Sequence, residues 1–178
     1  YTAINVTTKY TGTSTTATGS TLANITSTGV TALTVAGDKA LTLTSAAGLT
    51  GLKTVTVTGS AGLSASVAQA SVTAVNTSGT TGTATITLDA TKATYTGGAG
   101  VDMVTTSATA PSKAISLGAG DDSLTLATGT QAVTGAMSGG DGTDTLSMVT
   151  ADVVVADNDL AFSALVTGFE RLTLTGST

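Results

Sequence analysis

The 178-residue sequence contains no cysteine, no histidine and no tryptophan, and aromatic residues make up only 3% of it. Without cysteine, the chain has neither disulfides nor thiolate metal sites. Without histidine, it lacks the usual general base, the serine–histidine dyad and imidazole zinc sites. Any metal site in this protein would therefore be built from oxygen ligands.

Charge is scarce as well, since only 10% of the residues are charged and the formal net charge is −5. Six basic residues argue against a nucleic-acid partner and against an anionic membrane surface. Every apolar run is interrupted well before the roughly 18 residues that a spanning helix needs, so we expect no direct membrane insertion. The mean hydropathy of +0.37 indicates a folded chain rather than a disordered one. Because the sequence begins at Tyr1 without a targeting segment, we expect a piece of a longer protein.

Threonine supplies roughly a quarter of the residues, and most of the others are Ala, Gly, Ser, Val and Leu. β-Branched residues and frequent glycine disfavour helices. Short runs instead alternate an aliphatic residue with Thr or Ala and end near Gly, which is typical of half-buried strands. The clearest predicted strands are residues 32–37, 40–45, 54–59, 83–88, 123–128 and 171–176.

The predicted strands return at a fixed interval. LTVAG begins at Leu33 and VTVTG at Val55, 22 residues later. An interval of this size is typical of one turn of a β-solenoid. We therefore predict an all-β, parallel β-solenoid (a β-helix or β-roll) of roughly eight turns with a Val, Leu, Ile and Ala core. An antiparallel sandwich is the alternative, although it would more often carry a large aromatic core residue.

We divide the chain into three parts of one solenoid. Residues 1–90 are Thr-, Ser- and Ala-rich strand repeats, in which residues 7–20 form either a loose strand or a linker. Residues 91–150 hold glycine–aspartate motifs. Residues 151–178 are expected to form closing strands or a cap, with Phe169 packed inward and Glu170 paired with Arg171 at the surface.

Three nonapeptides fit the pattern G-G-x-G-x-D-x-U-x, where U is a large aliphatic residue. They are GGAGVDMVT (97–105), LGAGDDSLT (117–125) and GGDGTDTLS (139–147). One position departs from the pattern, because Leu117 stands where the first Gly is expected. The copies start 20 and 22 residues apart, which matches the interval of the strands. We therefore expect them to stack on one edge of the solenoid, about 4.8 Å apart.

The stacking has a chemical consequence. Glycines allow backbone conformations that turn carbonyl oxygens toward the gap between two turns. Asp102, Asp122 and Asp144 would then face the same gaps, where their carboxylates repel one another unless a cation lies between them. Oxygen ligation with flexible geometry selects Ca²⁺ over zinc or copper. Three stacked loops enclose two gaps, so at least two ions are expected.

The nonapeptide resembles the calcium-binding repeat of the RTX family, in which loops of successive turns share Ca²⁺ ions. The resemblance implies that Asp102, Asp122 and Asp144 supply side-chain ligands and that loop carbonyls supply most of the rest. The implied loop positions are Gly97, Gly98, Ala99, Gly100, Gly118, Gly120, Gly140 and Gly142. Because the motif occurs once in about 20 residues, only one edge should carry ions.

The remaining acids fit no such template. Asp121 and Asp141 lie inside the loops, and we expect solvated side chains there. Asp38 beside Lys39 is most simply a turn residue. A further site formed by Asp152, Asp157 and Asp159 stays open.

Thr/Ala-rich strands with few nonapeptides, followed by VTGFERLTLTG, resemble the calcium-dependent surface-layer (S-layer) proteins that Gram-negative bacteria export by type I secretion. The resemblance implies a secreted structural protein at the bacterial cell surface, in which Ca²⁺ drives folding and self-assembly with copies of the parent protein. The alternative is an RTX repeat region of a secreted adhesin or enzyme whose activity lies elsewhere in the chain. We do not expect an enzyme, because no nucleophile, base and oxyanion site can be assembled from these residues.

Overall fold

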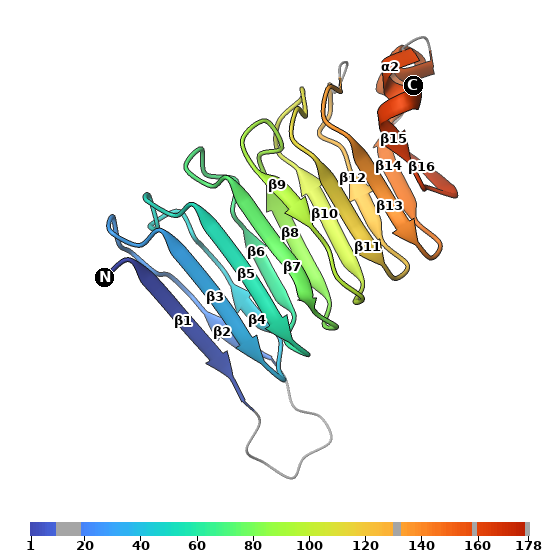
Figure 1. Cartoon of the computed structure of the whole chain (residues 1–178). Coiled ribbons are helices and arrows are strands. Elements are labelled where there is room, and N and C mark those ends of the chain that lie inside the picture. The colour runs from blue at the N-terminus through green and yellow to red at the C-terminus, as the bar shows by residue number, and fades with distance from the viewer. Residues whose placement is uncertain (10–18, 130–132, 158–159, 177–178) are drawn as a thin grey trace.

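The computed structural model describes residues 1–9, 19–129, 133–157 and 160–176, and these form a parallel β-solenoid built from two sheets (Figure 1). Within the described residues each sheet has eight strands, and every strand pair is parallel. The prediction of a parallel solenoid is confirmed, and the antiparallel sandwich is excluded.

Odd-numbered strands form one sheet and even-numbered strands the other, so the chain alternates between them. The first sheet consists of β1 (Ala3–Thr8), β3 (Ala32–Gly37), β5 (Thr54–Gly59), β7 (Ala74–Thr80), β9 (Thr94–Thr96), β11 (Ile115–Ala119), β13 (Met137–Asp141) and β15 (Val166–Thr167). The second consists of β2 (Ser20–Leu22), β4 (Leu41–Leu43), β6 (Leu63–Ser66), β8 (Ala84–Leu88), β10 (Asp102–Thr106), β12 (Ser123–Thr125), β14 (Thr145–Val149) and β16 (Arg171–Thr175).

Residues that are one repeat interval apart in the sequence pair with each other in neighbouring strands. Leu33 of β3 pairs with Val55 of β5, which is the 22-residue return of the LTVAG pattern. Both sheets continue across residue 90, so the Thr-rich repeats and the motif-bearing turns share one stack.

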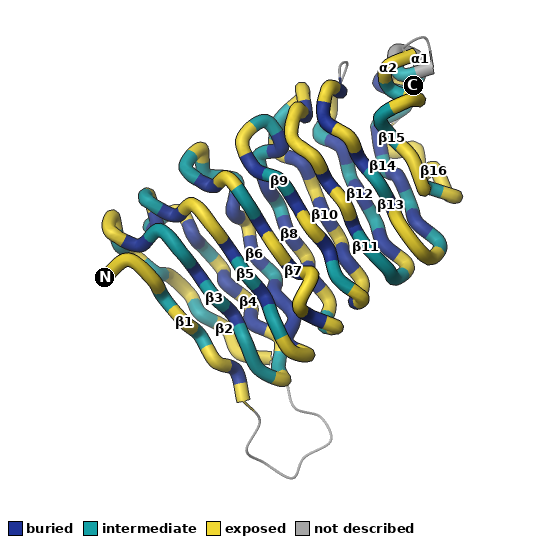
Figure 2. Tube along the Cα trace, viewed as in Figure 1, coloured by how far each residue is buried: buried dark blue, intermediate teal, exposed yellow. Residues whose placement is uncertain are grey.

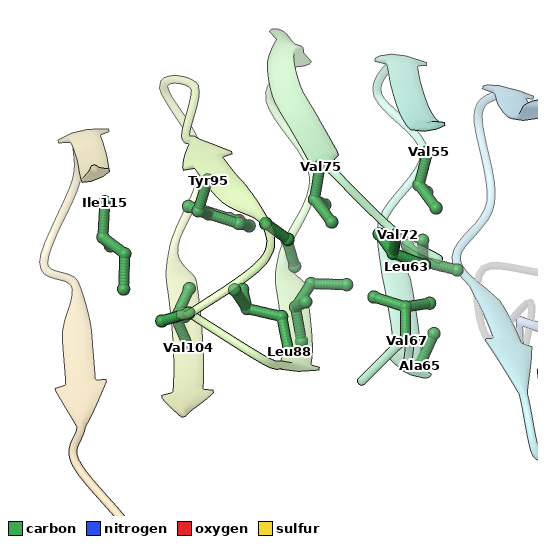
Figure 3. Close-up of a cluster of buried hydrophobic side chains, with 14 of the residues drawn as sticks. Val55, Leu63, Ala65, Val67, Val72, Val75, Leu88, Tyr95, Val104 and Ile115 are labelled. Atoms are coloured by element: carbon green, nitrogen blue, oxygen red, sulfur yellow. The ribbon is translucent and has the colours of Figure 1, made fainter. Parts of the chain in front are cut away.

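The core lies between the two sheets and is made mainly of aliphatic side chains. Buried residues occupy alternate positions along the strands (Figure 2). One inward column of the first sheet passes through Val55, Val75, Tyr95 and Ile115 in successive turns (Figure 3). The buried Tyr95 was not expected in a core predicted to be aliphatic, and its hydroxyl has a polar partner described below.

The last part of the chain combines helices with closing strands. Two short helices, α1 (Thr150–Asp157) and α2 (Leu160–Leu165), stand between β14 and β15 at the C-terminal end of the stack (Figure 1). The strand periodicity of the sequence did not predict them. After the helices, β15 and β16 rejoin the two sheets as their last strands, and Phe169 is partly buried against the core. No helix among the described residues is long and apolar enough to cross a membrane.

Candidate metal centre

The three nonapeptides lie one above another on one edge of the solenoid, where the chain passes from the first sheet into the second. Their aliphatic positions hold this alignment, because Val104 pairs with Leu124 and Leu124 with Leu146. All three of these side chains are buried in the core. The copies therefore stack in register, as their spacing predicts.

The aspartates of the three copies form a hydrogen-bonded ladder along this edge. Asp122 Oδ1 accepts the backbone N–H of Asp102 at 2.7 Å, and Asp144 Oδ1 accepts the backbone N–H of Asp122 at 2.9 Å. The ladder continues beyond the third motif, since Glu170 Oε2 accepts the backbone N–H of Asp144 at 2.8 Å. We call Asp102, Asp122, Asp144 and Glu170 the carboxylate column.

The three aspartates of the column are almost completely removed from solvent. Their exposed fractions are 1% for Asp102, 2% for Asp122 and 0% for Asp144. Burial raises the pKa of all three carboxyls, because desolvation disfavours the charged form. For Asp122 burial raises the pKa to about 6, with the neighbouring Asp102 and Asp144 carboxylates adding to the effect and the Asp102 N–H opposing it. At neutral pH the column thus concentrates charge that the protein alone does not compensate.

Two oxygens of the column have no hydrogen-bond partner. Asp122 Oδ2 and Asp144 Oδ2 are buried, and neither receives a donor from the described residues. Asp144 Oδ2 lies 2.5 Å from the point that a Cβ on Gly139 would occupy, and the carbonyl oxygen of Gly168 contacts the same point. Two acceptors therefore converge beside Gly139. Unpartnered buried carboxylate oxygens are costly, and a bound cation would remove that cost.

Glycines let the second and third loops stack closely. Gly118, Gly120, Gly140 and Gly142 have φ values of +106°, +139°, +117° and +137°, which side chains other than hydrogen rarely allow. At each of them a carbonyl of the preceding turn occupies the space of the missing Cβ: Gly98 O at Gly118, Gly100 O at Gly120, Gly118 O at Gly140 and Gly120 O at Gly142. The loops thus place backbone oxygens between successive turns, as the motif predicts.

The first loop has a different conformation, although its sequence matches the motif better than the second. Gly97, Gly98 and Gly100 are absent from the positive-φ glycines of the described residues. The N–H of Gly98 donates to Asp102 Oδ2 at 3.1 Å. Ala99 is exposed, and its N–H reaches the carbonyl oxygen of Thr80 at 3.4 Å.

A buried tyrosine completes the surroundings of Asp102. The Tyr95 hydroxyl donates to Asp102 Oδ1 at 2.7 Å and shares a 2.9 Å hydrogen bond with Thr77 Oγ1. Burial and the nearby Asp102 carboxylate both raise the Tyr95 pKa, so the phenol stays protonated and remains a donor. Both oxygens of Asp102 therefore have donors.

Three members of this site could not be found from the motif. Tyr95 and Thr77 come from positions outside the nonapeptide: Tyr95 precedes Asp102 by seven residues in the same turn, and stacking of the preceding turn brings Thr77. Glu170 follows a loop that is too short to match the pattern, and its acidic side chain after Gly168 was the only signal. Among the described residues no ion pair joins Glu170 to Arg171, because the carboxylate instead meets the Asp144 amide.

The other acids are not members of the hydrogen-bonded ladder, although the charges of Asp121 and Asp141 help to raise the pKa of Asp144. Asp121 and Asp141 are exposed, and Asp121 Oδ1 accepts the Thr143 N–H at 2.9 Å. Asp152 is buried in the first turn of α1, where Oδ2 accepts the Gly129 N–H at 2.8 Å. Asp157 is the last residue of α1, and Asp159 lies outside the described residues. Asp38 occupies a bend after β3, as predicted for a turn residue.

The oxygen atoms available as ligands fit a cation that is held mostly by the backbone. Within the described part of the chain, no three acidic side chains converge closely enough to hold a metal by themselves. The candidate ligands are instead carboxylate oxygens that accept no hydrogen bond and carbonyl oxygens of the glycine loops. This all-oxygen ligand set suits Ca²⁺. Asp122 and Asp144 would hold the ion through their free Oδ2 atoms.

Comparisons of the chain with protein-family models, with curated protein sequences and with solved structures give no match.

Proposed function

We propose that this chain is a structural calcium-binding module in which Ca²⁺ ions between the glycine loops hold successive solenoid turns together. The observation that carries the proposal is the pair of buried, unpartnered oxygens on Asp122 and Asp144. Each belongs to a carboxylate that is desolvated and close to another carboxylate. A divalent cation would compensate both penalties, so calcium binding and folding of this region would be coupled.

We further propose that the module belongs to a secreted bacterial surface-layer protein of RTX type, in which calcium also drives lattice assembly. Support comes from the dilution of three nonapeptides among Thr/Ala-rich strands, and from extracellular calcium levels suited to weak oxygen sites with a Kd of about 10⁻⁴–10⁻³ M. The chain would remain loosely folded in a low-calcium cytosol and fold after type I secretion.

A calcium-binding repeat region of a secreted adhesin or enzyme is the second candidate. It is favoured by the same stacked loops, because these require only calcium and not self-association. In both cases we infer a structural rather than a catalytic role for this chain. Support comes from the lack of histidine and from the concentration of acids in the glycine loops.

The first experiment is thermal unfolding of the 178-residue chain at pH 7.5 in chelator, in 10 mM CaCl₂ and in NaCl of the same ionic strength. At ten times Kd each site adds about 1.4 kcal/mol to the free energy of unfolding. For a chain of this length that corresponds to a rise in Tm of roughly 3–6 °C per site. An equal Tm in all three buffers would rule out the calcium proposal.

A further inference from the structure

The first and last aspartates of the carboxylate column differ in the hydrogen bonds that their Oδ2 atoms receive. This difference indicates which gaps between successive turns hold a cation. Two of the aspartates direct Oδ2 toward the next turn: Asp102 Oδ2 and the Leu117 carbonyl both lie beside Gly97, just as Asp144 Oδ2 and the Gly168 carbonyl lie beside Gly139. Because Asp122 is in register with both, the gap after each aspartate is the place where its Oδ2 would meet a cation. The three gaps are not equivalent.

At the gap after Asp102, the protein itself satisfies the carboxylate. Oδ2 receives the Gly98 N–H, and Oδ1 receives the Tyr95 hydroxyl. Thr77 Oγ1 lies 3.4 Å from Oδ1 and also bonds the tyrosine hydroxyl. Donors therefore satisfy both oxygens of an aspartate that is 1% exposed, and they offset part of the cost of burying its charge.

At the gaps after Asp122 and Asp144, the same hydrogen bond from the loop glycine is not made. Gly118 and Gly140, the counterparts of Gly98, have positive φ values of +106° and +117°. Neither Asp122 Oδ2 nor Asp144 Oδ2 has any donor. The change of glycine conformation thus coincides with the loss of the internal donor to Oδ2.

The gap after Asp144 is closed by a residue outside the nonapeptides. Glu170 is in register with Asp144, because Thr145 pairs with Arg171 and Leu146 with Leu172 in the adjacent strands. Its Oε2 takes the place in the ladder that Asp122 and Asp144 take in the earlier turns. The loop before it is three residues shorter than the loop of the third nonapeptide, since Ser138 pairs with Thr167 and Thr145 with Arg171.

We propose that the calcium ions occupy the gaps Asp122–Asp144 and Asp144–Glu170, that Glu170 is the third acidic ligand, and that Asp102 is a hydrogen-bonded cap rather than a ligand. This inference rests on the proposed calcium function. It keeps the ion that the motif predicts between Asp122 and Asp144, and it places the second ion between Asp144 and Glu170 instead of between Asp102 and Asp122. Asp144, which borders both gaps, then becomes the central carboxylate in place of Asp122.

The test is isothermal titration of the 178-residue chain with CaCl₂, with Tm measured in chelator and in calcium. Glu170→Gln keeps an acceptor for the Asp144 N–H and removes only the charge. We expect it to weaken one of two sites at least tenfold. Asp102→Asn should leave the number of sites at two and both affinities within twofold, while lowering Tm with and without calcium. Asp38→Asn, in a turn after β3, controls for the loss of one negative charge.

Tyr95→Phe is a second test of whether Asp102 is a hydrogen-bonded cap, in case Asp102→Asn does not fold. It removes the donor to Asp102 Oδ1 and keeps the packed ring, so Tm should fall in both buffers while the calcium affinities hold. Loss of a site in Asp102→Asn or Tyr95→Phe, or unchanged affinities in Glu170→Gln, would overturn the assignment while leaving the calcium function standing. If the wild-type chain binds no calcium at 10 mM, the proposed function itself fails.

Discussion

Asp122 carries two opposing contributions to stability, and which one dominates depends on calcium. Its Oδ1 accepts a ladder hydrogen bond that an amide oxygen can also accept, while its charge is desolvated and near three other carboxylates. In chelator the charge is a net cost. In calcium the same charge becomes a ligand, so a neutral replacement should act in opposite directions in the two buffers.

The corresponding prediction concerns Asp122→Asn. At pH 7.5 in chelator we expect its Tm to equal or exceed the wild-type value, because a neutral amide keeps the 2.7 Å hydrogen bond to Asp102 N–H without the buried charge. In 10 mM CaCl₂ the variant should gain less than half of the wild-type increase in Tm, and its calcium affinity should fall at least tenfold. Equal calcium titrations and equal melting for variant and wild type would show that Asp122 is not at a site.

A pH dependence follows from the same residue. The folded-state pKa of Asp122 is raised from 3.8 to about 6, so the folded chain holds a proton that the unfolded chain releases between these values. The stabilisation from this proton is complete below about pH 4 and disappears as the pH rises through 6. Calcium-free protein should therefore gain stability between pH 7.5 and 5, by about 1.4 kcal/mol from Asp122, because about one pKa unit of the shift lies within this range. Thermal melts in chelator, with Asp122→Asn as the control that loses most of the gain, would check this sign.

At the scale of single elements, the glycine loops decide how closely two turns approach. Gly140 has a φ of +117°, and the Gly118 carbonyl oxygen occupies the space that a Cβ on Gly140 would need. Gly129 has a φ of +85°, but the nearest atom to an added Cβ is Thr109 Cγ2 at 3.7 Å. The two glycines therefore separate the cost of backbone conformation from the cost of crowding between turns.

Alanine substitution at these two positions tests that distinction. Gly129→Ala should destabilise the chain by about 1–2 kcal/mol, which is the cost of left-handed backbone for a residue with a Cβ. Gly140→Ala should cost at least twice as much and should also weaken calcium binding, because the loop must move away from the Gly118 carbonyl. Chemical denaturation in chelator and calcium measures both effects. Equal losses in the two variants would mean that close stacking at Gly140 contributes nothing.

At the scale of the whole molecule, the solenoid presents open sheet edges at both ends. At the C-terminal end β16 is exposed along its length, and Leu172 and Leu174 are 53% and 50% exposed (Figure 2). Unpaired strand edges favour pairing with further β-structure. Two Ca²⁺ ions would also cancel most of the formal charge of −5, which lowers the repulsion between copies. Both features favour association when calcium is present.

The prediction at this scale concerns the parent protein of a surface lattice. Chelation should dissolve its assemblies into subunits, and added Ca²⁺ should restore ordered arrays visible by electron microscopy. NaCl at the same ionic strength should not restore them, because screening cannot replace a bound ion between two turns. A parent protein that stays monodisperse in millimolar calcium at high concentration would favour the repeat region of an adhesin or enzyme instead.

The sequence by itself determined the solenoid and the alignment of its motifs, because both depend on local alternation and on one repeat interval. Leu33 and Val55 are 22 residues apart in the sequence and adjacent in the sheet. Helices α1 and α2 were not predicted, since α1 contains the short stretch VVVAD, whose β-branched residues give no helical periodicity.

Only the tertiary structure decided what each acidic residue does. Gly98 and Gly118 occupy the same motif position, yet their backbones differ because the turns beneath them differ: carbonyls of Thr77 and Thr80 from strand β7 lie against Gly98, whereas the Gly98 carbonyl lies against Gly118. That difference gives Asp102 an internal donor and leaves Asp122 without one at Oδ2. Thr77 and Glu170 reach the column only through stacking of turns, and Tyr95 reaches Asp102 within one turn from a position outside the nonapeptide. A loop's partner in a solenoid is the neighbouring turn, so its chemistry depends on residues about 20 positions away.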